Sequence, residues 1–353
     1  MSVHERAAAW LARSRSKLAE LVTTRHFEQH PELTERYGQQ GRARCLEDNA
    51  HHLAYLEQAV AAGQHVLFEN YVVWARVLLK HLKLPVPDLA DNLQILRTII
   101  DERAPDDVAA RCLAPLDEIL AKYEELPTEV ETHLHPSQPY ATLAKRYLDL
   151  LMRAKRRQAS QIIIEAVDDG MSIRDVYRHV FQPVQYEIGR LWQLNQVSVA
   201  QEHFCTAATQ MIMSQLYPRL FTADFNGYRL VTACAYGDLH EIGARFLTDF
   251  FEMAGWDTYY IGANTPMRSL VQTLHEQDVH LVALSATLVT HVPVIAATVE
   301  TIRAEFPDLP IMVGGFPFLQ APELARNIGV DATAPDAESA VRVGLELVQR
   351  AAK

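Results

Sequence analysis

Asp238 and His240 are the residues whose types and spacing offer the most definite chemistry in this chain. An imidazole is a common metal ligand, and a nearby carboxylate can hydrogen-bond its second nitrogen, which fixes the tautomer and raises the basicity of the ligand. Gly243 follows, and its lack of a side chain would let a helix begin close to a bulky, flat ligand. The spacing predicts a loop that presents His240 to a metal ion.

This loop joins a predicted strand to a predicted helix. Residues 230–236 are apolar and strand-like, and residues 242–253 are helix-like. Farther along the chain, strands are expected near 257–262, 280–286, 311–315 and 331–335, and helices near 265–277, 291–305, 321–328 and 337–351. Alternating strands and amphipathic helices with short connections predict a doubly wound parallel sheet of the flavodoxin or Rossmann type. Ligands of such sheets bind outside the carboxyl ends of the strands, where His240 is expected.

The ends of the neighbouring strands add to the predicted site. One strand ends in the hydroxyls of Ser285 and Thr287, and another ends in the pair Gly314-Gly315. Hydroxyls and bare backbone at adjacent strand ends predict a deep slot for a long, planar group. With these elements in this order, residues 226–353 resemble the cobalamin-binding domain family.

The resemblance implies that cobalamin binds base-off, with His240 replacing the dimethylbenzimidazole as the lower cobalt ligand and Asp238 orienting it. The displaced nucleotide tail would lie in the predicted slot. The other loop residues expected to bind the cofactor are Leu239, Glu241, Ile242 and Gly243. The alternative is a loop histidine with satisfied hydrogen bonds in an ordinary flavodoxin-like fold.

Residues 138–224 are expected to form a four-helix bundle. Its helices are predicted at 138–151, 154–168, 172–194 and 198–216, with Ser172 and Ser198 as N-caps and Pro183 as a kink. A bundle that precedes a cobalamin domain would lie over the upper face of the corrin.

Trp192 and the pair Glu202-His203 are separated by a short predicted turn, which would bring them to one surface. Taken singly, they would be a buried bundle tryptophan and solvent-facing charges. Their spacing resembles the Trp-x9-Glu-His signature of light-sensing adenosylcobalamin domains, which implies that they form a pocket around the adenosyl group, lined also by Val199. Gln193 stands where the light-sensing repressors of that family have a second cobalt-binding histidine, so a bis-histidine state through that position is not expected.

Residues 1–130 are predicted to be a helical, globin-like domain, followed by a proline-bearing linker at 127–140. Helices are expected at about 5–23, 45–62, 64–82, 90–102 and 108–125. Arginine, histidine and aromatic side chains cluster between residues 37 and 74, and the candidate ligand-binding residues are Arg42, Arg44, His51, His52, Tyr71 and Trp74. An aromatic core is one interpretation of this cluster. A pocket for a flat, anionic chromophore is the other.

The whole arrangement resembles the photocobilins, photoreceptors that pair cobalamin with biliverdin in a degenerate globin-like domain. The resemblance implies a noncovalent biliverdin site in residues 1–130. Heme is a rival occupant, through His51, His52 or His65, and an empty dimerisation module is a third possibility.

Composition narrows the classes of function. A net charge of −11 argues against a nucleic-acid partner, because affinity for phosphate backbones depends on basic surface. Four scattered cysteines form neither a disulfide framework nor a zinc motif, and we find no membrane-spanning segment or signal peptide. We therefore expect a reduced, cytoplasmic protein.

The leading hypothesis is a photoreceptor in which light breaks a cobalt–carbon bond. Because no output domain follows the predicted sheet before Lys353, the signal is expected to pass through homo-oligomerisation or a separate partner. The alternatives are a corrinoid carrier that shuttles methyl groups between methyltransferases, and the cobalamin subunit of a radical mutase. No self-contained catalytic motif is present.

Overall fold

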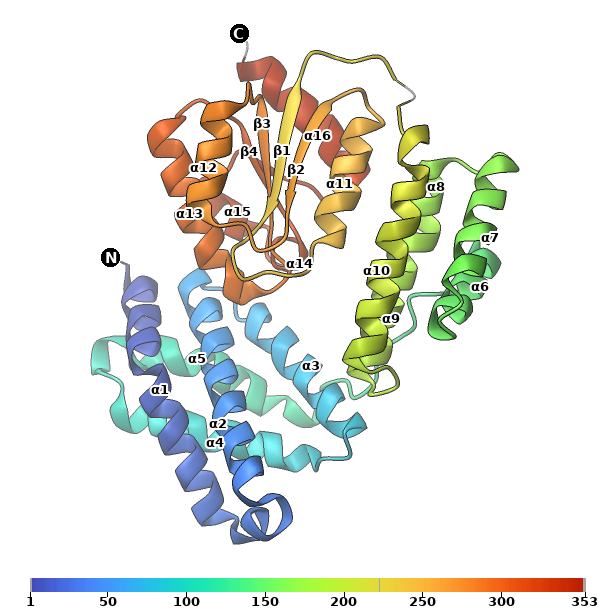
Figure 1. Cartoon of the computed structure of the whole chain (residues 1–353). Helices are drawn as coiled ribbons and strands as arrows, with labels where there is room; N and C mark the ends of the chain where they lie inside the picture. The colour runs from blue at the N-terminus through green and yellow to red at the C-terminus, as the bar shows by residue number, and fades with distance from the viewer. Residues whose placement is uncertain (1, 222, 352–353) are drawn as a thin grey trace. The chain divides into compact units, whose positions relative to one another are not determined.

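The computed structural model describes residues 2–221 and 223–351, without the side chains of Val86 and Pro87. The chain divides into two compact units, Met1–Glu129 and Val130–Lys353. The described part of the first unit is helical, and the second holds a helical bundle followed by an α/β domain (Figure 1). None of the described helices combines the length and the hydropathy that crossing a bilayer requires.

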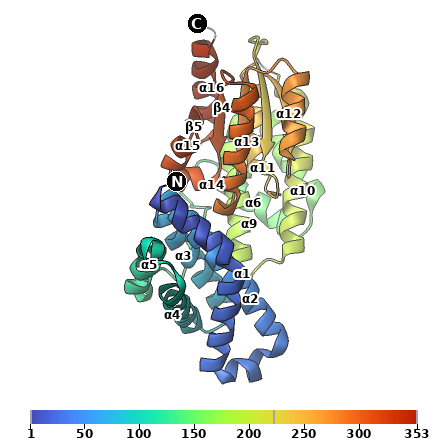
Figure 2. The ribbon, with the colours of Figure 1, turned by 90° about the vertical axis from the view of Figure 1, so that its left-hand side faces the viewer.

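The first unit confirms the prediction of a helical domain. Its helices are α1 (Val3–Gln29), α2 (Pro31–Ala62), α3 (Val66–His81), α4 (Val86–Arg103), α5 (Asp106–Ala121) and the short η1 (Tyr123–Glu125). Helices α1 and α2 pack along each other (Figure 2). Residues 31–44 are helical although we expected no helix there, with a kink at Gly38, whose φ is 60°. This stretch is mostly polar, so it lacks the apolar face on which our prediction relied.

The bundle contains the four predicted helical segments. They are α6 (Ala141–Met152), α7 (Arg156–Asp168), the continuous run of α8 (Ile173–Val176), η2 (Tyr177–Phe181) and α9 (Gln182–Gln193), and α10 (Val199–Leu216). The side chains of Ser172 and Ser198 accept hydrogen bonds from the first turns of their helices, as predicted. Beside Pro183 the helix does not simply kink. It widens into the π-helical turn η2, in which Gln182 N–H donates to the carbonyl of Tyr177, five residues earlier.

The α/β domain confirms the predicted parallel sheet. Its strands are β1 (Arg229–Cys234), β2 (Asp257–Gly262), β3 (Leu281–Ser285), β4 (Ile311–Gly314) and β5 (Ala332–Thr333), all paired in parallel in the order β2-β1-β3-β4-β5. The longer helices are α11 (Ile242–Glu252), α12 (Met267–Glu276), α13 (Val292–Glu305) and α16 (Ala337–Ala351), and the short ones are α14 (Phe316–Gln320) and α15 (Glu323–Asn327). Helix α11 packs with α16, and α12 packs with α13 (Figure 1). The chain changes direction of winding between β1 and β3, so their carboxyl ends are the place where such sheets bind ligands.

The bundle and the sheet domain share one apolar core. Phe246, Phe250 and Met253 of the sheet domain are buried among the bundle residues, and Tyr177 of η2 contacts the rings of Phe246 and Phe250. The hydroxyl of Tyr177 donates a hydrogen bond to the carboxylate of Asp249 over 2.6 Å. Both side chains are buried.

Asp249 should make the stability of this interface depend on pH. Burial raises the pKa of Asp249 to about 6, and Glu252 adds to this, while Tyr177 and Arg245 act in the opposite direction. Between about pH 4 and pH 6, Asp249 is therefore protonated in the folded state but ionised in the unfolded state. We expect the free energy of unfolding to fall between about pH 4 and pH 6, by up to about 3 kcal/mol. Asp249→Asn should remove this slope and stabilise the protein at pH 7, because an amide oxygen still accepts from Tyr177.

Denaturant unfolding at several pH values, followed by circular dichroism, measures this difference. Glu338→Gln is the control, since Glu338 is an exposed carboxylate that pairs with Arg178 across the same two parts of the unit. Stability curves of wild type and Asp249→Asn that stay parallel from pH 4 to pH 7 would contradict the assignment.

Candidate functional site

Asp238 and His240 form a directed pair in the loop after β1. The carboxylate of Asp238 is fully buried, and its Oδ1 accepts from the backbone N–H of His240 over 3.0 Å and from His240 Nδ1 over 2.8 Å. Its Oδ2 accepts from the backbone N–H of Thr287 over 2.6 Å. The imidazole is 59% exposed, and its Nε2 has no hydrogen-bond partner among the described residues. That lone pair is therefore available to a metal.

The electrostatics of the pair support this role. Burial alone would raise the pKa of Asp238, but the hydrogen bonds from His240 and Thr287 outweigh it and lower the pKa to about 2. The hydrogen bond to Asp238 raises the pKa of His240 against the effect of burial, and the charge of Glu202 adds to the increase. An ionised Asp238 favours the tautomer with the proton on Nδ1, which leaves Nε2 as the donor atom for a metal.

A second imidazole, His291, faces the same carboxylate and was missed in the sequence. It lies in the short helix η4 (Val289–His291), with Nδ1 3.3 Å from Asp238 Oδ2, although the angles do not make a hydrogen bond. A side chain on Gly237 would come within 3.6 Å of its Nε2. The one signal in the sequence was its position four residues after Thr287, in the connection that follows a predicted slot strand.

The other predicted strand ends lie next to this loop. Strand pairing sets Ser285 beside Cys234 on one side and beside Gly314 on the other. A side chain at Gly314 would meet nothing within 4 Å, so the backbone faces open space there. Gly315 has a different requirement, because its φ is 107° and a Cβ would stand 2.0 Å from the carbonyl oxygen of Ala286. The predicted slot residues are thus neighbours at the carboxyl edge of the sheet.

Large apolar side chains at this edge are exposed. They are Tyr236, Leu239, Phe316 and Leu319, with exposed fractions between 46% and 73%. Gathered apolar side chains of this kind mark a surface that a ligand or partner covers. Together with Nε2 of His240 and the open backbone at Gly314, this surface suits a large planar ring. Nε2 could bind a metal at the centre of the ring, and the space at Gly314 could accept a long substituent of it.

The residues inside the predicted motif separate into two groups. Leu239 is 73% exposed beside the site, and Gly243 is exposed, with open space where a Cβ would stand. Glu241 and Ile242 instead face the bundle: Ile242 packs against its core, and Glu241 contacts Gln210. In this structure both residues contact helix α10 or its core, and the expectation that they also contact the ligand stays a prediction.

The predicted cap residues lie around the turn between α9 and α10. Trp192 is partly buried near the end of α9, and Val199 is 51% exposed at the start of α10. Glu202 Oε2 is 3.5 Å from His203 Nε2, and the His203 side chain is 74% exposed. Glu202 is also close enough to His240 for its charge to act on that imidazole. The start of α10 therefore lies on the same side of the unit as the His240 loop (Figure 1).

In the first unit, aromatic side chains of α2 and α3 form a ladder. Tyr71 stacks on Tyr55 with ring centroids 3.9 Å apart and on Trp74 at 6.4 Å, and Trp74 is 38% exposed. The hydroxyl of Tyr71 is 2.8 Å from His52 Nδ1. Of the predicted chromophore residues, the structure brings His52, Tyr71 and Trp74 together.

The arginine and histidine residues predicted to bind a chromophore do not lie on one face of the first unit. Arg44 and His51 are exposed on α2, two turns apart. Arg42 is on another side of the helix, where it donates to Thr24 and lies over the ring of Phe27. Burial lowers the pKa of His52 to about 4, so its imidazole is neutral near pH 7. His65, a rival heme ligand, is 2.8 Å from Glu118.

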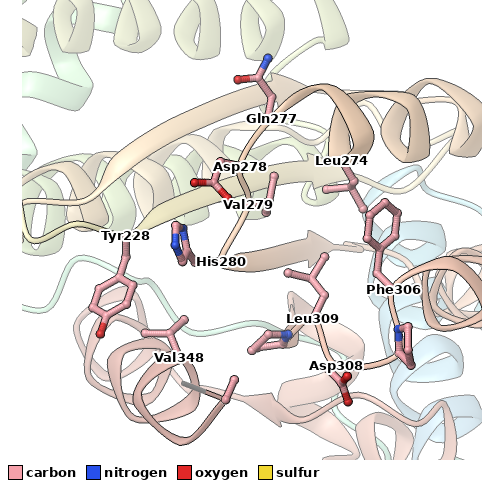
Figure 3. A pocket seen from close by; sticks show the side chains of 13 residues that line it. Tyr228, Leu274, Gln277, Asp278, Val279, His280, Phe306, Asp308, Leu309 and Val348 are labelled. Atoms are coloured by element: carbon pink, nitrogen blue, oxygen red, sulfur yellow. The ribbon is translucent and has the colours of Figure 1, made fainter. Parts of the chain in front are cut away.

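A separate cavity of about 500 Å³ opens at the opposite, amino edge of the sheet (Figure 3). Its walls come from the segments that precede β3 and β4 and from α16, and they include Tyr228, His280, Phe306 and Val348. His280 Nδ1 already accepts the backbone N–H of Arg229. This cavity is distinct from the His240 loop.

Comparisons with known proteins give three family matches. Residues 228–343 and 143–217 each match a B12 binding domain family, and residues 3–154 match the phycobilisome protein family.

The curated relatives of this chain include corrinoid proteins. Dimethylamine corrinoid protein 3 of Methanosarcina mazei is 30% identical over 121 residues, which are 34% of this chain and 71% of that protein. Monomethylamine corrinoid protein 1 of Methanosarcina acetivorans is 26% identical over 54% of this chain and 90% of its own length. For several other dimethylamine corrinoid proteins, the chain spans only 55–56% of their length.

Among solved structures, the Methanosarcina barkeri monomethylamine corrinoid protein superposes with a TM-score of 0.53 and 21% identity. The superposition covers 59% of this chain and 100% of that one. At this level of identity, the likeness supports the fold of the bundle and sheet.

Proposed function

This chain belongs to the family of corrinoid-binding proteins with a B12 binding domain, and we propose that it holds cobalamin base-off with His240 as the lower cobalt ligand. The observation that carries the proposal is the Asp238–His240 pair, in which Asp238 binds Nδ1 of a 59% exposed imidazole and Nε2 has no hydrogen-bond partner among the described residues. Ser285, Thr287, Gly314 and Gly315 would flank the nucleotide tail at the neighbouring strand ends.

We further propose that the protein is a light sensor with two chromophores. Adenosylcobalamin supplies a cobalt–carbon bond that light breaks. Trp192, Val199, Glu202 and His203 would enclose the adenosyl group from the bundle, and the charge of Glu202, which contributes to the raised pKa of His240, supports this arrangement.

The second chromophore would be biliverdin in the first unit. Two observations support it: the match of residues 3–154 to phycobilisome proteins, and the aromatic ladder of Tyr55, Tyr71 and Trp74, in which Tyr71 is buried and Trp74 is exposed. Flat rings stack on conjugated tetrapyrroles, and the exposed Arg44 and His51 are available to propionate groups.

A corrinoid carrier for methyl transfer is the second candidate function. The names of the curated relatives favour it, because they are corrinoid proteins for methylamines. A carrier would use the same His240 loop but would present a cobalt-bound methyl group to a separate methyltransferase. It would have no need of an adenosyl pocket or of a phycobilisome-like unit.

Illumination separates the two functions. We expect adenosylcobalamin-loaded protein to change its mass or shape when lit, because the loss of contacts made in only one state shifts a conformational equilibrium. A differential interaction of about 3 kcal/mol would change a two-state ratio more than a hundredfold. Trp192→Ala should uncouple this change from photolysis, and Tyr186→Ala, an exposed aromatic on the same helix, should not.

Size-exclusion chromatography with light scattering, on dark and illuminated full-length protein, is the measurement. Absorption spectra with added biliverdin test the first unit in the same samples, since a bound bilin should show a sharpened, red-shifted band. Identical mass and shape in both light states, with photolysis complete, would leave the carrier as the better function.

A further inference from the structure

Glu241, which directly follows His240, connects the ligand loop to the bundle. Its Oε1 accepts from Gln210 Nε2 of helix α10 over 2.9 Å. Its Oε2 accepts from the hydroxyl of Tyr260 and from the backbone N–H of Ala263, each over 3.1 Å. Donors from the bundle and from the end of β2 thus converge on one carboxylate.

The β2 side of this contact is a fixed support. Asn264, which follows β2, accepts from Gly237 N–H through its side chain over 2.8 Å and donates its own N–H to the carbonyl of Asp238 over 2.9 Å. The loop is therefore held to the sheet independently of Gln210. Removing the Gln210 contact should leave the shape of the loop intact while releasing it from the bundle.

Helix α10 connects Gln210 to the predicted adenosyl pocket, because Val199, Glu202 and His203 lie on the same helix. Gln210 lies eight residues beyond Glu202 on one continuous helix, a distance of about 12 Å along the axis. Because a helix moves as a rod over this length, a displacement at Gln210 also moves Glu202 and His203. His240 and Glu241 are adjacent in the chain, so a shift of the imidazole must move the backbone that carries the carboxylate.

We propose that Glu241 is a positioning residue that couples the state of the His240 ligand to helix α10 through Gln210. This inference rests on the proposed binding of cobalt by His240. It assigns to Glu241 a role apart from direct contact with the cofactor. When His240 binds or releases cobalt, the loop shifts, and the Glu241–Gln210 contact passes this shift to α10 and so to the predicted adenosyl pocket.

The structure offers a matched control for this contact. Arg245 donates to Ser214 over 3.0 Å, so Ser214 is also a residue of α10 that hydrogen-bonds the sheet domain. Ser214 lies one turn beyond Gln210, and its partner is on helix α11 and not on the ligand loop. Ser214→Ala removes this bundle–sheet hydrogen bond and the bond from Ser214 Oγ to the backbone carbonyl of Gln210, but it leaves the side-chain contact between Gln210 and Glu241 in place.

Hydrogen–deuterium exchange of the full-length protein, with and without adenosylcobalamin in the dark, tests the coupling. In the wild type, we expect loading to slow exchange about tenfold both in residues 238–245 and in the first three turns of α10. In Gln210→Leu, the loop should keep its protection, and the effect on α10 should fall to less than about twofold. Ser214→Ala should behave like the wild type.

A reciprocal variant excludes a merely structural effect. Glu241→Gln combined with Gln210→Glu restores a hydrogen bond between the two positions and should recover part of the α10 response that either single variant loses. Full α10 protection in cobalamin-loaded Gln210→Leu would overturn the coupling. If cobalamin-loaded His240→Ala has the same absorption spectrum as the wild type, His240 does not bind cobalt. The proposed coupling would then fail together with the proposed ligation.

Discussion

Replacing His240 by Ala should lower the affinity of the protein for cobalamin by about 100-fold or more. The substitution removes the proposed lower ligand, and even the loss of a residue that only orients a metal ligand costs about 10–100-fold. The fold should persist, because Asp238 still accepts the backbone N–H groups of Thr287 and residue 240. Any cobalamin that remains bound should have the absorption spectrum of a form without a nitrogen ligand from below.

Titration of the purified protein with adenosylcobalamin and with hydroxocobalamin, followed by absorption, measures both effects. His275→Ala is a matched control, since His275 is 56% exposed and pairs with the carboxylate of Glu305, as His240 pairs with Asp238. Asp238→Asn should have a smaller effect, near tenfold, because the imidazole stays but its orientation and basicity change. A His240→Ala protein with wild-type affinity and spectrum would exclude this residue as the ligand.

The largest expected effect on stability is that of Gly315→Ala. At a φ of 107°, an alanine is strained, and its Cβ would be 2.0 Å from the carbonyl oxygen of Ala286. This contact involves the backbone of the neighbouring strand end, which cannot rotate away. We expect a loss of about 3 kcal/mol or more, seen as a decrease in Tm of roughly 6–12 °C.

Gly314→Ala is the paired test, because the two glycines are adjacent and only one needs to be glycine for the fold. A Cβ at residue 314 meets nothing within 4 Å, so the Tm of the protein without cofactor should change by only a few degrees. The same methyl group would project into the space proposed for the nucleotide tail and should weaken cobalamin binding about tenfold or more. If Gly314→Ala destabilises the fold as much as Gly315→Ala, or leaves binding unchanged, the slot is assigned to the wrong residues.

Several features could be predicted from the sequence because they depend on local interactions. Strand and helix positions in the α/β domain follow from the period of apolar residues, and Ser172 and Ser198 cap their helices through bonds that span three residues. The hydrogen bond between Asp238 and His240 spans two residues and is set by the loop itself. Whether that imidazole binds cobalt stays a prediction.

Other features depended on how distant segments pack. His291 reaches Asp238 only because β1 and β3 are neighbours in the sheet, and Glu241 contacts Gln210 only because α10 packs beside the loop. The burial that makes His52 neutral results from the packing of α2 against α3, and its residue type alone did not reveal it. The apolar period of the sequence determined which segments form strands and helices. Which polar side chains of those segments meet was decided by the tertiary structure, because hydrogen bonds between distant residues require positions that only the packed core establishes.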